Sequence, residues 1–187
     1  MEKIRTFIAV ELPAAVREYL GSVTAELAAH TKSGLVRWVR PERMHLTLCF
    51  LGETAVSQVP AVAAALDRVA VQQRPFQLQL TELGAFPNQK RPRVVWVGLG
   101  GEMALLAALK QQVDEALLPL GWPPEKRPFN PHLTLGRVKD SGVGQQIRWQ
   151  TGVEQLVIPV TAVHLIESQL RPDGPRYTIR HSSRWGE

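Results

Sequence analysis

A tetrapeptide that occurs twice in this sequence combines residue types suited to proton transfer. His45-Leu46-Thr47-Leu48 recurs as His132-Leu133-Thr134-Leu135, displaced by 87 residues from position 45 to position 132. Average residue usage gives such a tetrapeptide about once per 10⁵ positions, so chance does not explain a second copy in so short a chain. Each copy also follows a proline-containing segment, RPERM before the first and FNP before the second. A repeat at a fixed distance with similar surroundings indicates two duplicated lobes related by a pseudo-twofold axis.

The spacing within each copy separates two faces of a strand. Because alternate side chains point the same way, His45 and Thr47 lie on one face about 6–7 Å apart, and the two leucines lie on the other. The second copy repeats this pattern, so two histidines and two threonines would face a common cleft. One histidine can take a proton from water while the other gives one to a departing oxygen, and the hydroxyls can hold phosphate oxygens. The pattern predicts phosphate chemistry that needs no metal and no other cofactor.

Two other interpretations of these histidines are open from the sequence. Each histidine can be an ordinary polar residue on a half-exposed strand, although the repetition argues against this for the pair. A metal site needs three or four ligands, and no Asp, Glu or Cys lies near His132 on its strand. Glu42 and His45 have a Glu-x-x-His spacing, but that ligand geometry needs a helix, which Pro41 and the extended run at His45 disfavour.

The elements that carry the motifs follow from hydrophobic periodicity. Alternating or β-branched runs predict strands at 5–10, 36–39, 45–51, 76–83, 94–99, 132–138, 157–169 and 177–182. Helices are predicted at 14–29, 57–73 and 102–118, where apolar residues recur at three- and four-residue spacing or alanines accumulate. The strands 76–83 and 94–99 should pair, and a turn at 171–175 should join the last two strands. The mixed order favours an α+β fold with largely antiparallel sheets over a doubly wound fold.

Composition limits the class of protein. A length of 187 residues suits one domain, or one domain built from two similar lobes. The chain has 22 Lys and Arg against 17 Asp and Glu, a net charge of +5, which favours a phosphate-bearing partner. The single cysteine, Cys49, excludes an internal disulfide and fits a reducing setting. No apolar segment approaches the roughly 20 residues of a membrane span and no secretory signal is present, so we expect a soluble cytoplasmic protein.

The sequence resembles the 2H phosphoesterases, a family named for two His-x-Thr-x motifs, and among them the LigT-like RNA 2′,3′-cyclic phosphodiesterases, also called 2′-5′ RNA ligases. The resemblance covers essentially the whole chain. Besides the two HLTL motifs it includes RTFIAVELP, RWVRPERMHLTLCFLGE, RPRVVWVGL, PFNPHLTLGR and GPRYTI. It implies a single bilobal α+β domain over residues 1–187, with two mostly antiparallel sheets flanking a central cleft and helices on the outside.

The resemblance also implies roles for individual residues. His45 would donate a proton to the leaving ribose oxygen, and His132 would activate the attacking water, an assignment that rests on the resemblance because both motifs are chemically alike. Thr47 and Thr134 would hold the phosphate. The implied reaction opens a 2′,3′-cyclic phosphate at an RNA 3′ end and leaves a 2′-phosphomonoester. Some members also join or split 2′-5′ linked RNA ends. We expect a monomer that acts on RNA or oligonucleotide ends.

Two further residues match the family pattern. Arg137 matches an arginine after the second motif that would neutralise phosphate charge. Strand alternation argues against this role, because position 137 is an odd number of residues from His132 and Thr134 and so faces the other side of a regular strand. The objection does not hold if the strand bulges or ends at Gly136. Phe7 matches an aromatic residue on the first strand, which would either stack on a base or belong to the core.

Other candidate residues have simpler interpretations. Cys49 continues the face of His45 and Thr47 by parity, but its small apolar side chain favours burial. Lys90, Arg91 and Arg93 lie on a predicted loop, where a solvated charge run is the ordinary explanation and guidance of an RNA backbone is the alternative.

The sequence leaves three functional hypotheses. The leading one is a metal-independent RNA 2′,3′-cyclic phosphodiesterase. The second is a nucleotide- or RNA-binding protein without turnover, for which a damaged motif would be the signature, and both motifs here are intact. The third keeps the enzyme and changes the substrate, toward 2′-5′ RNA ends or cyclic phosphates on small nucleotides, because the motifs hold phosphate and do not read the base.

Overall fold

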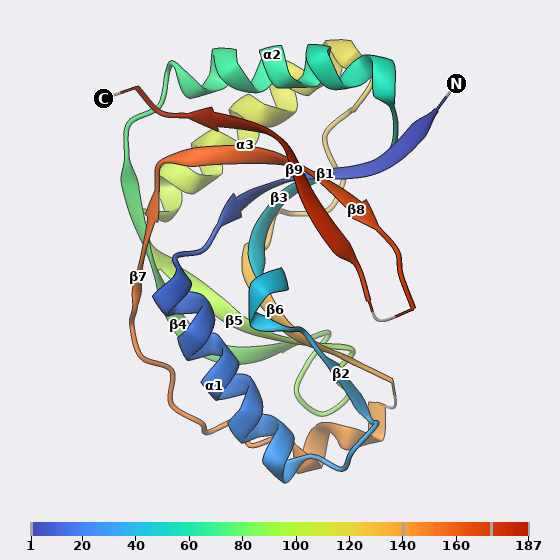
Figure 1. The fold of residues 1–187 in the computed structure, drawn as a ribbon. Coiled ribbons are helices and arrows are strands. Elements are labelled where there is room, and N and C mark those ends of the chain that lie inside the picture. Colours follow the sequence, from blue (N-terminus) through green and yellow to red (C-terminus); the bar gives the residue numbers. More distant parts are fainter. Residues whose placement is uncertain (1, 140, 173, 187) are drawn as a thin grey trace.

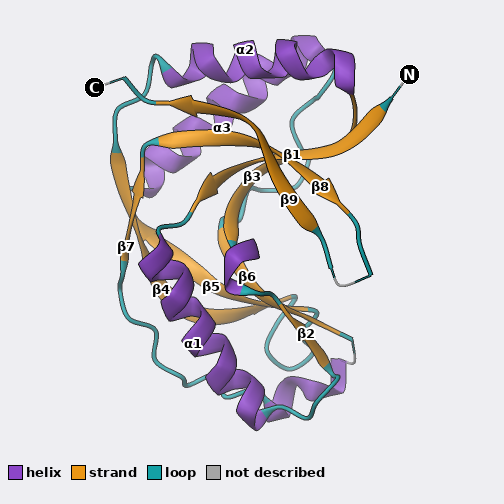
Figure 2. Ribbon diagram, viewed as in Figure 1, coloured by secondary structure: helices purple, strands orange, loops and turns teal. Residues whose placement is uncertain are grey.

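Two antiparallel sheets form the framework of the molecule, for which a computed structural model describes residues 2–139, 141–172 and 174–186 (Figures 1 and 2). The first sheet has the strand order β3 (His45–Ala55), β1 (Lys3–Glu11), β8 (Ala162–Gln169), β9 (Arg176–Arg184). The second has the order β2 (Val36–Trp38), β6 (His132–Val138), β5 (Val94–Gly101), β4 (Phe76–Phe86), β7 (Val157–Val160). Each motif histidine is the first residue of a strand, one strand in each sheet. The predicted α+β class with antiparallel sheets is confirmed.

Three helices cover the outer surfaces of the sheets. Helices α2 (Val59–Ala70) and α3 (Met103–Leu117) pack against each other, and α2 also packs on β8 and β9 of the first sheet, at the top of Figure 1. Helix α1 (Ala14–His30) follows Pro13, contacts β2 and lies at the second sheet in the same view. Its inner face carries the apolar residues expected from their spacing, Val16, Leu20, Val23 and Leu27. None of the described helices has the length and apolar character that a membrane crossing requires.

The duplication seen in the motifs extends to the strand order. The first sheet, starting at its motif strand, has the order β3, β1, β8, β9. The second sheet, starting at its own motif strand, has the corresponding order β6, β5, β4, β7, and β2 is an extra edge strand beside β6. Along the chain, a strand and a helix precede each motif strand: β1 and α1 come before β3, and β5 and α3 come before β6. The motif strands β3 and β6 contact each other, so the two sheets meet along the strands that carry the histidines.

Several predicted boundaries shift by a few residues in the structure, and three differences bear on the path of the chain. The segment 157–169, predicted as one strand, is two strands that belong to different sheets, β7 beside β4 and β8 beside β1. Strand β3 continues to Ala55 instead of ending at residue 51, and Gly52 at φ 69° allows the backbone to continue through this point. The corner before the first motif contains a short 3₁₀ turn, Pro41–Arg43, and the extended strand begins directly after it.

A continuous hydrophobic core joins both lobes. Leu46 and Leu48 of the first motif and Leu133 and Leu135 of the second are almost completely buried in it. Burial of four leucines, each worth about 1.5–3 kcal/mol, fixes the register of both motif strands. The histidines and threonines therefore face away from the core, as the alternation predicted.

Candidate active site

The two motif histidines are held in the same way. Nδ1 of His45 lies 2.9 Å from the carbonyl oxygen of Arg43, and Nδ1 of His132 lies 2.7 Å from the carbonyl oxygen of Asn130, in each case two residues before the histidine. A carbonyl oxygen can accept but cannot donate a hydrogen bond, so each Nδ1 must carry the proton. Nε2 is then the nitrogen left for a substrate. The repeat is therefore a repeat of side-chain geometry as well as of sequence.

Aromatic rings surround both histidines and hold their orientation. In the first lobe, the ring of Phe7 stacks on His45 with 4.7 Å between centroids, and Tyr177 packs edge-on against it at 5.2 Å. In the second lobe, Phe86 packs edge-on against His132 at 4.9 Å, and Trp96 lies at 6.4 Å. These aromatic residues come from β1, β9, β4 and β5, so each site is built from several strands of its sheet.

A glycine makes room for the second aromatic set. The indole of Trp96 occupies the space where a side chain at Gly84, its partner on β4, would otherwise lie. Any larger residue at position 84 would displace the ring that packs beside His132. A glycine inside a strand often marks such a close approach.

The surroundings of the first site favour uncharged histidine in the free protein. Burial lowers the pKa of His45 to about 4, and the hydrogen bond to the Arg43 carbonyl opposes this effect. Burial also raises the pKa of Tyr177, against the positive charges of Arg137, Arg43 and Arg5. Because Arg137 belongs to the second sheet and Tyr177 to the first, this electrostatic contact brings groups of both lobes to one place.

Matching bulges follow the two motifs and decide which later side chains reach the site. On β3, Thr47 pairs with Ala9 but Cys49 pairs with Ile8, so Leu48 is an extra residue. On β6, Thr134 pairs with Trp96 but Gly136 pairs with Val95, so Leu135 is the extra residue. A bulge of this kind shifts the alternation of the side chains that directly follow it by one position. The residue five positions after each histidine therefore returns to the histidine face.

These bulges settle the two parity arguments from the sequence. Arg137 lies opposite Val94 and, after the bulge, on the face of His132 and Thr134, so the parity objection does not apply to it. Cys49, which simple alternation placed on the histidine face, is 7% exposed and belongs to the core instead. Burial raises the pKa of its thiol to about 11, so the sulfur stays protonated at neutral pH.

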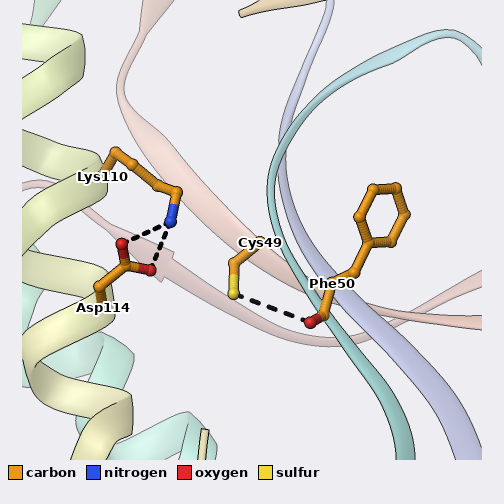
Figure 3. A network of polar contacts seen from close by, with 4 residues as sticks. All are labelled: Cys49, Phe50, Lys110 and Asp114. Atoms are coloured by element: carbon orange, nitrogen blue, oxygen red, sulfur yellow. Dashed lines mark hydrogen bonds and ion pairs between the residues drawn. The ribbon is translucent and has the colours of Figure 1, made fainter. Parts of the chain in front are cut away.

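Figure 3 shows this change of side at β3. The sulfur of Cys49 points toward α3, where Lys110 and Asp114 form a part-buried ion pair at 2.5 Å, and the ring of Phe50 points away to the other side. Phe50 is 62% exposed, and its ring lies 6.2 Å from that of Phe7. Phe50 and Arg137 are thus equivalent positions in the two lobes, one an exposed aromatic ring and the other a cation.

The structure brings some of the sequence candidates together and leaves others apart. His45 and Thr47, and likewise His132, Thr134 and Arg137, share one face of their strands. Phe7 is 4% exposed and packs beneath His45, so its ring is not available to stack on a base.

The basic loop residues remain on the surface. Lys90, Arg91 and Arg93 are exposed on the β4–β5 connection, where the side chain of Asn88 accepts hydrogen bonds from the backbone of Lys90 and Arg91. Within the described residues, no three His, Cys, Asp or Glu side chains gather as a metal site would require.

Sequence reasoning missed the aromatic residues Phe50, Tyr177, Phe86 and Trp96. A signal for one of them was present, because Phe50 stands five residues after the first histidine, as Arg137 stands five after the second. The other three come from strands that the chain brings beside the motifs only on folding.

Two antiparallel sheets that each present one His-x-Thr strand define a phosphoesterase of the two-histidine class. The chain matches the family described as LigT like Phosphoesterase over residues 10–96 and 100–177, and it belongs to that family. It is 38% identical over 154 residues to an RNA 2′,3′-cyclic phosphodiesterase of Aeropyrum pernix, covering 80% of this chain and 85% of the relative. A protein of the same name from Archaeoglobus fulgidus is 36% identical over 176 residues, covering 93% and 96%.

Solved structures share this architecture. Escherichia coli LigT, crystallised with 3′-AMP, superimposes with a TM-score of 0.83 at 28% identity, and the match covers 100% of both chains. TT0787 of Thermus thermophilus superimposes with a TM-score of 0.79 at 30% identity, covering 97% of each chain. The duplicated two-sheet fold is therefore that of the family.

Proposed function

We propose that this chain hydrolyses 2′,3′-cyclic phosphates at the 3′ ends of RNA and leaves 2′-phosphomonoesters. The relatives described above carry the name RNA 2′,3′-cyclic phosphodiesterase, and a LigT structure holds 3′-AMP. The observation that carries the proposal is the duplicated histidine geometry, in which Nδ1 of each ring donates to a backbone carbonyl and Nε2 is left for the substrate. Two such nitrogens supply the acid and the base that opening a cyclic phosphodiester requires.

The proposed reaction is one displacement at phosphorus. Nε2 of His132 takes a proton from water as the water oxygen attacks phosphorus. The bond between phosphorus and the ribose 3′ oxygen breaks, and Nε2 of His45 gives its proton to that oxygen. The hydroxyls of Thr47 and Thr134 donate hydrogen bonds to the non-bridging oxygens, and the guanidinium of Arg137 offsets their growing charge.

The acid role of His45 requires the substrate to change its pKa. In the free chain burial lowers the pKa of His45 to about 4, so the ring is neutral at pH 7. An anion within hydrogen-bond distance of Nε2 favours the charged imidazole and raises that pKa. Binding of the phosphate would therefore favour protonation of His45. Substrate binding near neutral pH would then be accompanied by proton uptake.

The difference between the two lobes supports the orientation of the substrate. Phe50 offers an exposed ring beside the stacked Phe7 and His45, and single-stranded RNA is commonly bound by stacking of its bases on such rings. A base on Phe50 places its ribose toward His45, where a ribose oxygen would leave. Arg137, in the opposite lobe, would lie beside the charged oxygens of the phosphate.

The test is product analysis on an RNA that ends in a 2′,3′-cyclic phosphate, with EDTA present. We expect a 2′-phosphate product, and rate losses of roughly 10² to 10⁴ for His45→Ala and for His132→Ala. A 3′-phosphate product would reverse the assigned acid and base, and full activity of either variant would refute the mechanism. Tight binding with no product would favour the non-catalytic hypothesis instead.

A further inference from the structure

A band of arginines extends from the candidate active site along one edge of the molecule, and the reaction above uses one of them. Arg137 on β6 lies directly opposite Arg37 on the edge strand β2. Directly opposed side chains share a face with about 5 Å between their Cβ atoms, and like charges in such positions destabilise a sheet. A bound anion removes this cost, because guanidinium groups pair well with phosphate oxygens. The opposed pair therefore indicates an anion-binding edge.

The band continues at the turn between β8 and β9. A Cβ atom at Gly174 would lie 3.2 Å from Nη2 of Arg37 and would overlap the guanidinium of Arg43. Gly174 also has a φ of +113°, a region that side chains rarely adopt. The absence of a side chain at position 174 thus lets two guanidinium groups from the β2–β3 segment reach the backbone of this turn.

A cavity of about 270 Å³ opens beside the turn and adjoins the first histidine. Its lining residues are Glu42, Arg43, Arg171, Pro175, Arg176 and Tyr177. Among the described residues, this lining contains three arginines and one glutamate, an excess of positive charge. The ring of Tyr177 lines the cavity and also packs edge-on against His45 at 5.2 Å. A ligand that occupies the active site can therefore continue into the cavity without leaving the protein surface.

We propose that this arginine band, formed by Arg37, Arg43, Arg137, Arg171 and Arg176, binds the phosphodiester backbone of RNA upstream of the reactive 3′ end. The inference rests on the proposed function, because the terminal nucleotide at His45 fixes where the strand starts. A nucleoside 2′,3′-cyclic phosphate reaches the histidines and leaves the cavity at Arg171 and Arg176 empty. The enzyme should then prefer oligonucleotides, and salt should weaken that preference.

The test compares adenosine 2′,3′-cyclic phosphate with a pentanucleotide that ends in a 2′,3′-cyclic phosphate. We expect kcat/KM at low salt to be at least about tenfold higher for the pentanucleotide. In a plot of log kcat/KM against log salt concentration, the slope for the pentanucleotide should be steeper by about 0.7 for each additional phosphate bound. The variant R171Q/R176Q should lose most of this preference through a higher KM for the pentanucleotide. Its effect on the mononucleotide should stay below about threefold. The control R68Q/R74Q removes the same charge at exposed positions on or just after α2.

The outcomes separate this inference from the proposed function. Equal kcat/KM values for the two substrates, or equal losses on both substrates in R171Q/R176Q, would overturn the arginine band. Absence of hydrolysis for both substrates would overturn the proposed function. In that case, fluorescence anisotropy with the labelled pentanucleotide still tests the band, because R171Q/R176Q must bind it about tenfold more weakly than R68Q/R74Q. Equal binding by the two variants would reject the band.

Discussion

Replacement of His45 by glutamine should make the protein less sensitive to acid, although it removes a proposed catalytic group. Burial lowers the pKa of His45 from 6.5 to about 4 in the folded chain. As the pH falls through 6.5, the unfolded chain binds a proton at this position and the folded chain does not until about pH 4. The free energy of unfolding therefore decreases as the pH falls from 6.5 to about 4. The stability that the neutral His45 contributes is fully present only above pH 6.5.

The size of the effect follows from the two proton affinities. Each tenfold difference in proton affinity is worth about 1.4 kcal/mol, so a change from 6.5 to about 4 amounts to about 3 kcal/mol. Glutamine does not titrate, so H45Q should lack this part of the pH dependence. Burial also lowers the pKa of His164, but this histidine is present in both proteins, so its contribution cancels from the comparison.

Urea unfolding at pH 7 and at pH 4.5, followed by circular dichroism, measures the difference. We expect the free energy of unfolding of the unmodified chain to fall by about 2–3 kcal/mol more than that of H45Q between these two pH values. The control H30Q alters an exposed histidine at the end of α1 and should follow the unmodified chain. If H45Q and the unmodified chain lose stability in parallel, His45 is not held neutral by burial, and the argument fails.

Three other predictions concern single interactions. F50A should raise KM for adenosine 2′,3′-cyclic phosphate roughly tenfold and leave hydrolysis of the base-free ribose 2′,3′-cyclic phosphate unchanged, whereas equal effects would show that Phe50 does not stack on the base. R137Q should lower kcat/KM at least tenfold and R137K should recover only part of it, because a lysine cannot form the bidentate contact; full recovery would show that charge alone matters. K110A should destabilise the fold by about 1–3 kcal/mol in thermal unfolding because it leaves the partly buried Asp114 without its partner. K110M/D114L should recover most of that loss, a result that an exposed ion pair would not give.

The sequence predicted the elements of the fold better than their assignment to sheets. The strand and helix positions followed from local periodicity, because each depends on residues close together in the chain. The segment 157–169 was wrong as one strand, since its two halves pair with β4 and β1, and such partners are chosen by tertiary packing. Most of the aromatic surroundings of His45 and His132 were missed for the same reason, because Tyr177, Phe86 and Trp96 reach them from other strands.

Simple strand alternation misplaces two residues, for each of which the sequence had offered an alternative, burial for Cys49 and a bulge for Arg137. Parity placed Cys49 on the histidine face and Arg137 on the opposite face, and one extra residue in each strand reverses both assignments. The extra residues, Leu48 and Leu135, end their motifs and are buried on the same side as the preceding leucines. The sequence allowed a bulge near Gly136 but did not place the extra residue at Leu135, because leucine suits a regular strand equally well.

For the proposed function, the two bulges suggest a way in which a duplicated fold would act on an asymmetric substrate. His45 and His132 are chemically alike, and their hydrogen bonds to backbone carbonyls are the same, so symmetry alone assigns neither as the acid. A phosphate bound between them is nearly symmetric, but a nucleotide has a base on one side. The first position after each motif that faces the site again is Phe50 in one lobe and Arg137 in the other. The lobe with the aromatic ring suits the base and the lobe with the cation suits the charge, so we propose that the residues five positions beyond each histidine set the orientation of the substrate.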